Sequence, residues 1–175
     1  PWGCGKTSIL NMMLEEIEKM SKEAERLLVL RFEPWNFTST DQLFEQFFMM
    51  LTNRLISDKD QKKKAIGTAI AEYGEAFDVF KSVPVFGGAI ATLAKTGAKL
   101  TAKKLSNGFT RKEIQEQKKA VEKLLREFDK KLLIVIDDID RLSNDQIRQV
   151  FQLVTSVAKF PNTIYFLAFD RKIVV

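Results

Sequence analysis

Residues 3–7 read Gly-Cys-Gly-Lys-Thr, and an amphipathic helical pattern follows them at once. This order matches the second half of the phosphate-binding loop G-x-x-x-x-G-K-[ST], whose first glycine would stand one residue before Pro1. In such a loop the glycines let backbone N–H groups turn toward phosphate oxygens, and the N-terminus of the helix adds positive potential. We therefore expect phosphate contacts from Gly3, Cys4, Gly5, Lys6, Thr7 and Ser8.

Two carboxylates further along the chain complement this loop. Asp137 and Asp138 directly follow the apolar run Leu132–Ile136, which has the length of a buried strand. A strand that delivers a carboxylate at its C-terminal end supplies the second half of a magnesium–nucleotide site. We expect Thr7 and Asp137 to bind Mg²⁺, with Lys6 on the phosphates and Asp138 acting on the attacking water. The alternative for the two aspartates is a solvated turn after a core strand.

The composition removes several other chemistries. The 175 residues include no histidine and one cysteine, so the chain has no internal disulfide, no His/Cys zinc cluster and no Ser-His or Cys-His nucleophile pair. Apolar residues make up 45% and charged residues 29%, as in folded soluble domains. Because the chain opens inside the phosphate-binding loop and lacks an initiator Met, we expect it to be an interior part of a longer protein.

The elements that would position these residues alternate between helices and strands. Helices are predicted from about Thr7, from Thr40 or Asp41, around Ile114–Phe128, and from a capping box of Ser143 and Gln146 through Val157. The predicted apolar stripe of the first helix is Ile9, Leu10, Met13, Leu14, Ile17 and Met20, and that of the second is Leu43, Phe44, Phe47, Phe48, Leu51 and Leu55. Strands are predicted over Leu27–Phe32, Leu132–Ile136 and Thr163–Phe169. Because each strand is apolar without a break, the pattern indicates an α/β domain whose parallel sheet is covered by helices on both faces.

Four stretches together resemble the KAP family of P-loop NTPases. They are the Pro-Trp-Gly-x-Gly-Lys-Thr opening, Arg31-Phe32-Glu33-Pro34-Trp35, Ile136-Asp137-Asp138-Ile139-Asp140-Arg141, and Phe166-Leu167-Ala168-Phe169-Asp170-Arg171. The resemblance spans residues 1–175, although residues 57–119 carry none of it. It implies a three-layer P-loop NTPase fold, with a mainly parallel sheet flanked by helices and a helical insertion between the Walker A and Walker B motifs.

The resemblance also implies functional details that spacing does not give. ATP is the expected nucleotide on this ground alone, and the strand before Asp170 would lie beside it, which gives Asp170 a sensor position near the γ-phosphate. A helix cap is the alternative for Asp170. Arg141 would pair with Asp140 or brace the loop, and a structural salt bridge is favoured over a catalytic role. We expect Trp35 to be a packed anchor beneath the site rather than a platform for the base.

Residues 57–119 form a basic, mostly helical insertion in this interpretation. They carry 13 Lys and Arg against 7 Asp and Glu, a net charge of +6, and the rest of the chain carries 15 against 16, so the whole excess of +5 belongs to this segment. Their uncharged stretch, Ser82–Ala94, is too short to cross a bilayer and is broken by Pro84. Three interpretations stay open: a hairpin packed on the domain, a patch on anionic lipid, and a homo-oligomer contact. Nucleic-acid binding is disfavoured, because few aromatic residues stand between the lysines.

The sequence thus predicts an enzyme, an ATPase that needs Mg²⁺ and uses hydrolysis to drive a conformational switch. The alternative is a membrane-associated scaffold or signalling module that binds nucleotide without hydrolysing it. In either case we expect a cytoplasmic protein, and the lipid interpretation of residues 57–119 would place it at the inner face of the membrane.

Overall fold

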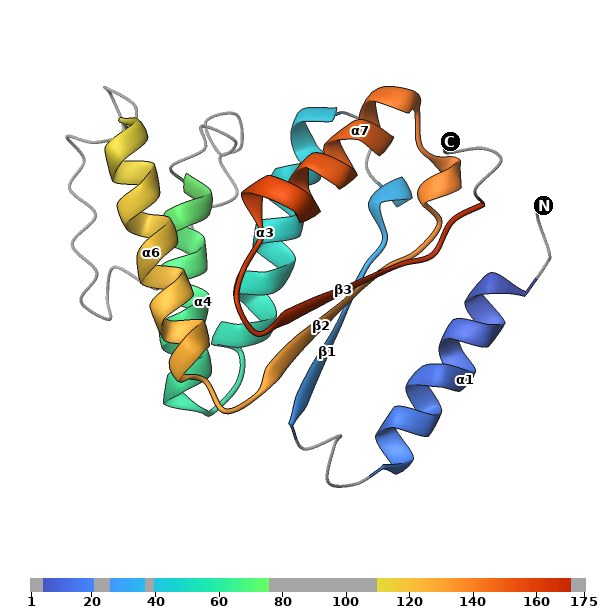
Figure 1. Cartoon of the computed structure of the whole chain (residues 1–175), viewed down its shortest axis with the longest axis horizontal. Helices are drawn as coiled ribbons and strands as arrows, with labels where there is room; N and C mark the ends of the chain where they lie inside the picture. Colours follow the sequence, from blue (N-terminus) through green and yellow to red (C-terminus); the bar gives the residue numbers. More distant parts are fainter. Residues whose placement is uncertain (1–4, 21–25, 37–39, 76–109, 171–175) are drawn as a thin grey trace. The chain divides into compact units, whose positions relative to one another are not determined.

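A computed structural model describes residues 5–20, 26–36, 40–75 and 110–170 of the chain (Figure 1). Strands β1 (Leu27–Phe32), β2 (Lys131–Ile136) and β3 (Thr163–Leu167) form a parallel sheet in the order β1-β2-β3. Phe32 pairs with Ile136, and Ile136 pairs with Leu167. All three strands therefore end at the same edge of the sheet. The predicted α/β architecture with a parallel sheet is confirmed.

The central strand β2 is buried from Leu132 to Ile136, as its unbroken apolar run predicts. Successive side chains of a strand point to opposite faces. Leu133 and Val135 pack against helix α1 (Lys6–Lys19) on one face. On the third strand, Tyr165 alternates with Phe166 of that same cluster, and its hydroxyl donates to the backbone oxygen of Ala158 at 2.6 Å. This hydrogen bond attaches the segment before β3 to the face of the sheet that lies opposite α1.

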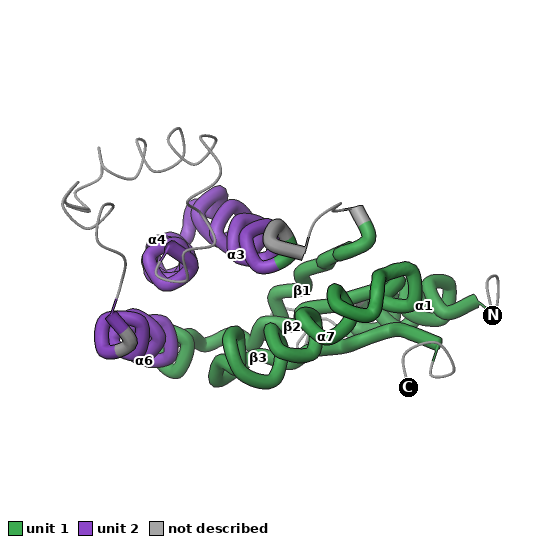
Figure 2. Tube along the Cα trace, turned by 90° about the horizontal axis from the view of Figure 1, so that it is seen from above, with its two compact units in different colours: residues 1–43, 125–175 green, residues 44–124 purple. Residues whose placement is uncertain are grey.

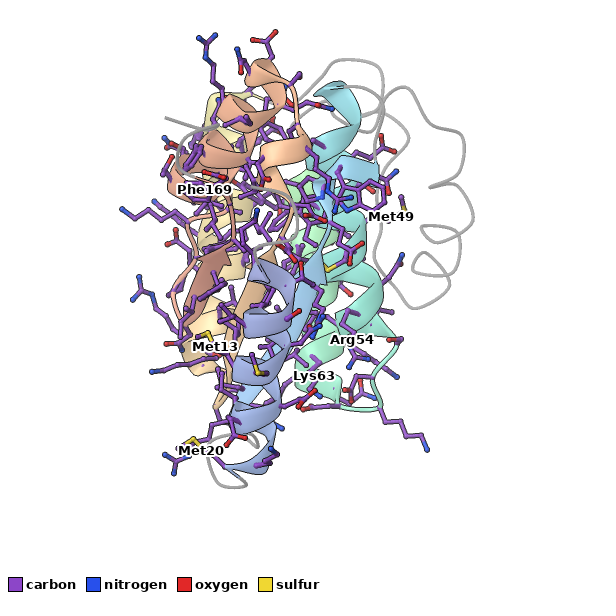
Figure 3. The ribbon with its side chains drawn as sticks, turned by 90° about the vertical axis from the view of Figure 1, so that its right-hand side faces the viewer. Met13, Met20, Met49, Arg54, Lys63 and Phe169 are labelled. Carbon is purple, nitrogen blue, oxygen red and sulfur yellow. The ribbon has the colours of Figure 1, made fainter. Side chains whose placement is uncertain are left out.

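Helix α1 buries a narrower stripe than the sequence predicts. Leu10 and Leu14 are 3% and 5% exposed and face the sheet, whereas Met13 and Met20 are 43% and 56% exposed and project from the helix (Figure 3). Ile9 is also exposed. The difference arises because residues four apart lie on one line of a helix, so Leu10 and Leu14 meet the sheet while Ile9 and Met13 lie beside them on the flank.

Helix α7 (Asn144–Gln152) begins with the predicted capping box. Ser143 Oγ accepts from the Gln146 backbone N–H, and the Ser143 N–H donates to Gln146 Oε1 at 3.0 Å. The regular helix predicted through Val157 is wrong at its end, because the chain changes to a π-helical turn, η3 (Leu153–Val157). Strand β3 is also shorter than predicted and ends at Leu167 instead of Phe169.

The chain divides into two compact units, residues 1–43 with 125–175 and residues 44–124 (Figure 2). The second unit is built from α3 (Thr40–Ile56), α4 (Gln61–Glu75) and α6 (Arg111–Glu127), each taken within residues 44–124. Its core contains Phe48 of α3, whose ring meets Tyr73 of α4 edge-on with the ring centroids 5.7 Å apart. The stripe predicted on α3 is confirmed, since Leu43, Phe47, Phe48, Leu51 and Leu55 are all buried, and Phe44 is partly buried.

The predicted insertion, residues 57–119, is described in part. Residues 76–109 lie outside the described residues, and with them the uncharged stretch Ser82–Ala94 and the lysines at 95, 99, 103 and 104. The limits of the insertion and its three interpretations therefore stay predictions. None of the helices in the described part of the chain is both long enough and apolar enough to cross a membrane.

Candidate functional site

The loop lysine–threonine pair and the carboxylates after β2 come together at the edge where the strands end. Thr7 Oγ1 donates a hydrogen bond of 2.8 Å to Asp137 Oδ2. Lys6 Nζ donates to Asp140 Oδ2 at 3.3 Å. These two contacts join the first turn of α1 to the segment after β2, across 130 and 134 positions of sequence. The two halves of the predicted site are therefore adjacent in the fold.

Gly5 sets the entry into α1. Its φ of 80° lies in the left-handed region that favours glycine, and its backbone oxygen accepts from the Ile9 N–H at 2.8 Å as the helix begins. The backbone N–H groups in the first turn of a helix have no hydrogen-bond acceptor within the helix. Together with the helix dipole, they attract anions. Lys6 and Thr7 begin the helix at this point, so their side chains stand beside an anion-attracting end.

The segment after β2 turns sharply at Asp138. This residue has φ 58°, in the left-handed region that glycine, asparagine and aspartate adopt more readily than other residues. A 3₁₀ turn, η2 (Ile139–Arg141), follows. The Asp138 N–H donates to Asp137 Oδ1 at 2.8 Å. Asp137 thus accepts one hydrogen bond on each carboxylate oxygen, from Thr7 and from the backbone, and both fix its orientation.

The side chain of Asp140 is enclosed in the site. Its side chain is 4% exposed, and that of Lys6 is 21% exposed. Ile139, which precedes it in the 3₁₀ turn, is fully buried. One carboxylate oxygen, Oδ2, binds Lys6, whereas the other, Oδ1, is buried without a hydrogen-bond partner.

Arg141 forms a salt bridge, as predicted. Its Nε lies 3.1 Å from Asp138 Oδ1, and its guanidinium carbon lies 5.2 Å from the centroid of the Trp35 ring. Asp140, which the sequence offered as a partner, binds Lys6. Trp35 belongs to the short helix η1 (Pro34–Asn36) after β1 and is 42% exposed, so its predicted role as a packed anchor is wrong. Its ring supports the arginine through a cation–π contact.

The environment of Asp138 disfavours its charged form. Burial raises the pKa of its carboxyl above the ordinary value, and the charge of Asp137 adds to the rise. Arg141 acts on the pKa in the opposite direction. A carboxyl whose pKa is raised in this way is better suited to accept a proton than an exposed one.

The remaining predicted residues fall in three groups. Gly3 and Cys4 lie outside the described residues. Ser8 is exposed in the first turn of α1. Asp170 follows β3 at the same edge of the sheet as Asp137, and the preceding Phe169 packs edge-on against Phe151 of α7 at 6.0 Å. The sensor role of Asp170 stays a prediction.

The donor set fits a magnesium–phosphate ligand. Mg²⁺ prefers oxygen ligands and is usually bound by one or two carboxylates together with substrate phosphates. Thr7 Oγ1 and Asp137 Oδ2 are such oxygens and already lie 2.8 Å apart. Over the described ranges, no group of three or more His, Cys, Asp or Glu side chains could enclose a metal by itself. The arrangement therefore suits an ion whose remaining coordination positions are filled by oxygens of a bound ligand.

Sequence reasoning missed the pairing of Lys6 with Asp140 and of Arg141 with Asp138. The second pair had a local signal, since residues three apart face one another across a single helical turn. The first pair had none, because it joins residues 134 positions apart and depends on the turn at Asp138.

The comparisons with known proteins identify a family of P-loop domains. A family model described as "KAP family P-loop domain" matches residues 1–175. The phage T7 exclusion protein of Escherichia coli K12 is 27% identical over an alignment that covers 99% of this chain and 25% of that protein. The chain therefore spans about a quarter of the length of the curated relative it matches. No solved structure gave a significant match.

Proposed function

This chain belongs to the KAP family of P-loop domains, and we propose that it binds ATP with Mg²⁺ and hydrolyses the β–γ bond to drive a conformational switch. Membership of a P-loop family supports nucleotide binding. The choice of ATP, the need for Mg²⁺ and the hydrolysis step are the parts that we propose. The observation that carries them is the hydrogen bond between Thr7 and Asp137, which brings the two oxygen ligands together.

Each residue of the site has a defined task in this proposal. Lys6 and the first-turn amides of α1 bind the β- and γ-phosphate oxygens. Thr7 and Asp137 hold Mg²⁺, which would neutralise charge on the phosphates when bound. Asp138 orients the attacking water and accepts its proton, for which its raised pKa suits it. Catalysis consists of positioning and charge stabilisation, without a covalent intermediate on the protein.

The experiment measures binding and hydrolysis separately in the purified protein. ATP binding is followed by calorimetry in the presence of MgCl₂, and hydrolysis by release of inorganic phosphate. We expect Asp138→Asn to bind ATP nearly as well as the unaltered protein and to release phosphate about 100-fold more slowly, because general-base contributions are typically of this size. Asp145→Asn is the matched control, since that carboxylate is 77% exposed on α7. Equal turnover in all three proteins contradicts the assignment of Asp138.

A second candidate is a nucleotide-bound switch that does not hydrolyse. It is favoured by the salt bridge between Asp138 and Arg141, which occupies the carboxylate that would otherwise receive the water. Tight ATP binding without phosphate release, in the unaltered protein and in Arg141→Ala alike, would support this second function. Phosphate release by the unaltered protein would exclude it.

A further inference from the structure

Asp140 is a buried carboxylate that is directed at the phosphate-binding lysine and has unused bonding capacity. Its side chain is 4% exposed, and Oδ2 accepts from Lys6 Nζ at 3.3 Å. Its other oxygen, Oδ1, is enclosed without a hydrogen-bond partner. Asp137 differs, because both of its oxygens accept hydrogen bonds, and Asp138 differs because Arg141 balances its charge. We therefore expect the buried charge of Asp140 to depend on Lys6 more than the charge of Asp137 or Asp138 depends on its own partner.

A phosphate group that binds Lys6 has to share this lysine with Asp140. A phosphate oxygen in contact with Nζ would lie within a few ångströms of Oδ2, since Nζ is itself 3.3 Å from that oxygen. Like charges at this separation repel strongly where water is excluded. If Lys6 turns fully to the phosphate, Asp140 remains a buried carboxylate without a counter-ion, which is costly in a protein interior.

We propose that Asp140 is the internal competitor of the nucleotide phosphate for Lys6, and so limits how tightly the phosphate binds. In the nucleotide-free protein the carboxylate holds the lysine beside Thr7 and the start of α1. Binding of nucleotide replaces this ion pair by a lysine–phosphate contact and leaves Asp140 repelled by the phosphate. This inference rests on the proposed function, because it takes Lys6 as the residue that binds phosphate.

The test compares ATP affinities of the purified protein and two variants by calorimetry in MgCl₂. Asp140→Asn keeps the shape and a hydrogen-bonding oxygen but removes the negative charge. We expect it to bind ATP about tenfold more tightly, as removal of a buried like charge next to a ligand typically changes affinity by an order of magnitude or more. Asp145→Asn, which removes an exposed carboxylate of α7, should bind as the unaltered protein does.

Two results would overturn the inference. Weaker binding by Asp140→Asn would mean that Asp140 positions Lys6 for the phosphate, and unchanged affinity would mean that the ion pair has no bearing on binding. If the unaltered protein does not bind ATP, the proposed function fails as a whole. Binding by the unaltered protein with no gain in Asp140→Asn rejects the competition alone.

A second variant and a second measurement guard against misfolding. Asp140→Ser removes the same charge with a smaller side chain, and we expect the same gain in affinity if Asp140→Asn does not fold. In the unaltered protein, acetylation by acetic anhydride followed by mass spectrometry reports on Lys6 without any substitution. Lys6 should react more slowly than Lys19, which is 67% exposed. Equal reactivity of the two lysines in the nucleotide-free protein would contradict the ion pair between Lys6 and Asp140.

Discussion

The Thr7 hydroxyl donates a hydrogen bond to the Asp137 carboxylate, with Oγ1 and Oδ2 2.8 Å apart. Thr7 belongs to the first turn of α1 and Asp137 to the end of the central strand, so the contact links a helix N-terminus to the edge of the sheet. The same two oxygens are the ones that we propose as ligands of Mg²⁺. The fold itself brings this pair together.

Removal of the Thr7 hydroxyl should uncouple ATP binding from Mg²⁺. In Thr7→Ala the methyl group cannot bind a cation, so we expect the ATP affinity in MgCl₂ to fall about tenfold or more, toward the value in EDTA. Thr7→Ser keeps the hydroxyl and should stay close to the unaltered protein. Calorimetric titrations in MgCl₂ and in EDTA measure both variants. If Thr7→Ala keeps its full response to Mg²⁺, the threonine is not a magnesium ligand.

Arg141 should stabilise the segment after β2 through two contacts at once. It lies over the Trp35 ring and pairs with Asp138, so we expect Arg141→Ala to lower the free energy of unfolding by about 1 kcal/mol. Urea unfolding, followed by fluorescence, measures this change. Arg148→Ala is the control, because Arg148 is 81% exposed and pairs with another exposed side chain.

A double-mutant cycle separates the two contacts of Arg141. If the cation–π contact contributes, Arg141→Ala should cost less stability in a Trp35→Leu background than in the unaltered protein. Identical costs in the two backgrounds would show that Trp35 and Arg141 are energetically independent.

The second compact unit, residues 44–124, should become less stable as the pH rises toward neutrality. Burial raises the pKa of Glu75 from 4.5 to about 7, and the charge of Glu72 adds to the rise. Between these values the unfolded chain loses a proton that the folded chain keeps, so the free energy of unfolding falls as the pH rises and levels off above about 7. We expect a loss on the order of 1 kcal/mol, because water reaches part of this carboxyl and screens it.

Glu75→Gln tests the origin of this pH dependence. Urea unfolding across this pH range, followed by circular dichroism, should show a smaller slope than in the unaltered protein. Some slope should remain, since burial also raises the pKa of Glu45 in α3. Substitution of the exposed Glu127 by Gln should leave the slope as it is. An unaltered slope in Glu75→Gln would show that another group is responsible.

Much of the sheet and half of the site could be predicted from the sequence. Leu132–Ile136 is apolar throughout, so its burial and its delivery of Asp137 to the sheet edge follow from composition and length. The capping box of Ser143 and Gln146 is a local pattern and could be predicted for the same reason. Where a structural feature depends on a few neighbouring residues, their local interactions determine it.

The parts that could not be predicted depend on the tertiary structure. The choice between Leu10 and Met13 on α1 is made by which side of the helix meets the sheet, and both residues fit the same periodic pattern. Likewise, Asp140 reaches Lys6 only because the chain reverses at Asp138 with φ 58°. A run of three aspartates within four positions gives no indication of which one faces the lysine.

The proposed binding of ATP phosphates by Lys6 is tested by a comparison of two lysine variants. ATP affinity in MgCl₂ is measured for Lys6→Ala and for Lys19→Ala, which removes a lysine from the exposed far end of the same helix. We expect Lys6→Ala to bind ATP at least about 100-fold more weakly and Lys19→Ala to bind it normally, because of the two lysines Lys6 alone would form charge-assisted contacts with phosphate. ATP binding by Lys6→Ala with unaltered affinity would contradict the proposed role of Lys6.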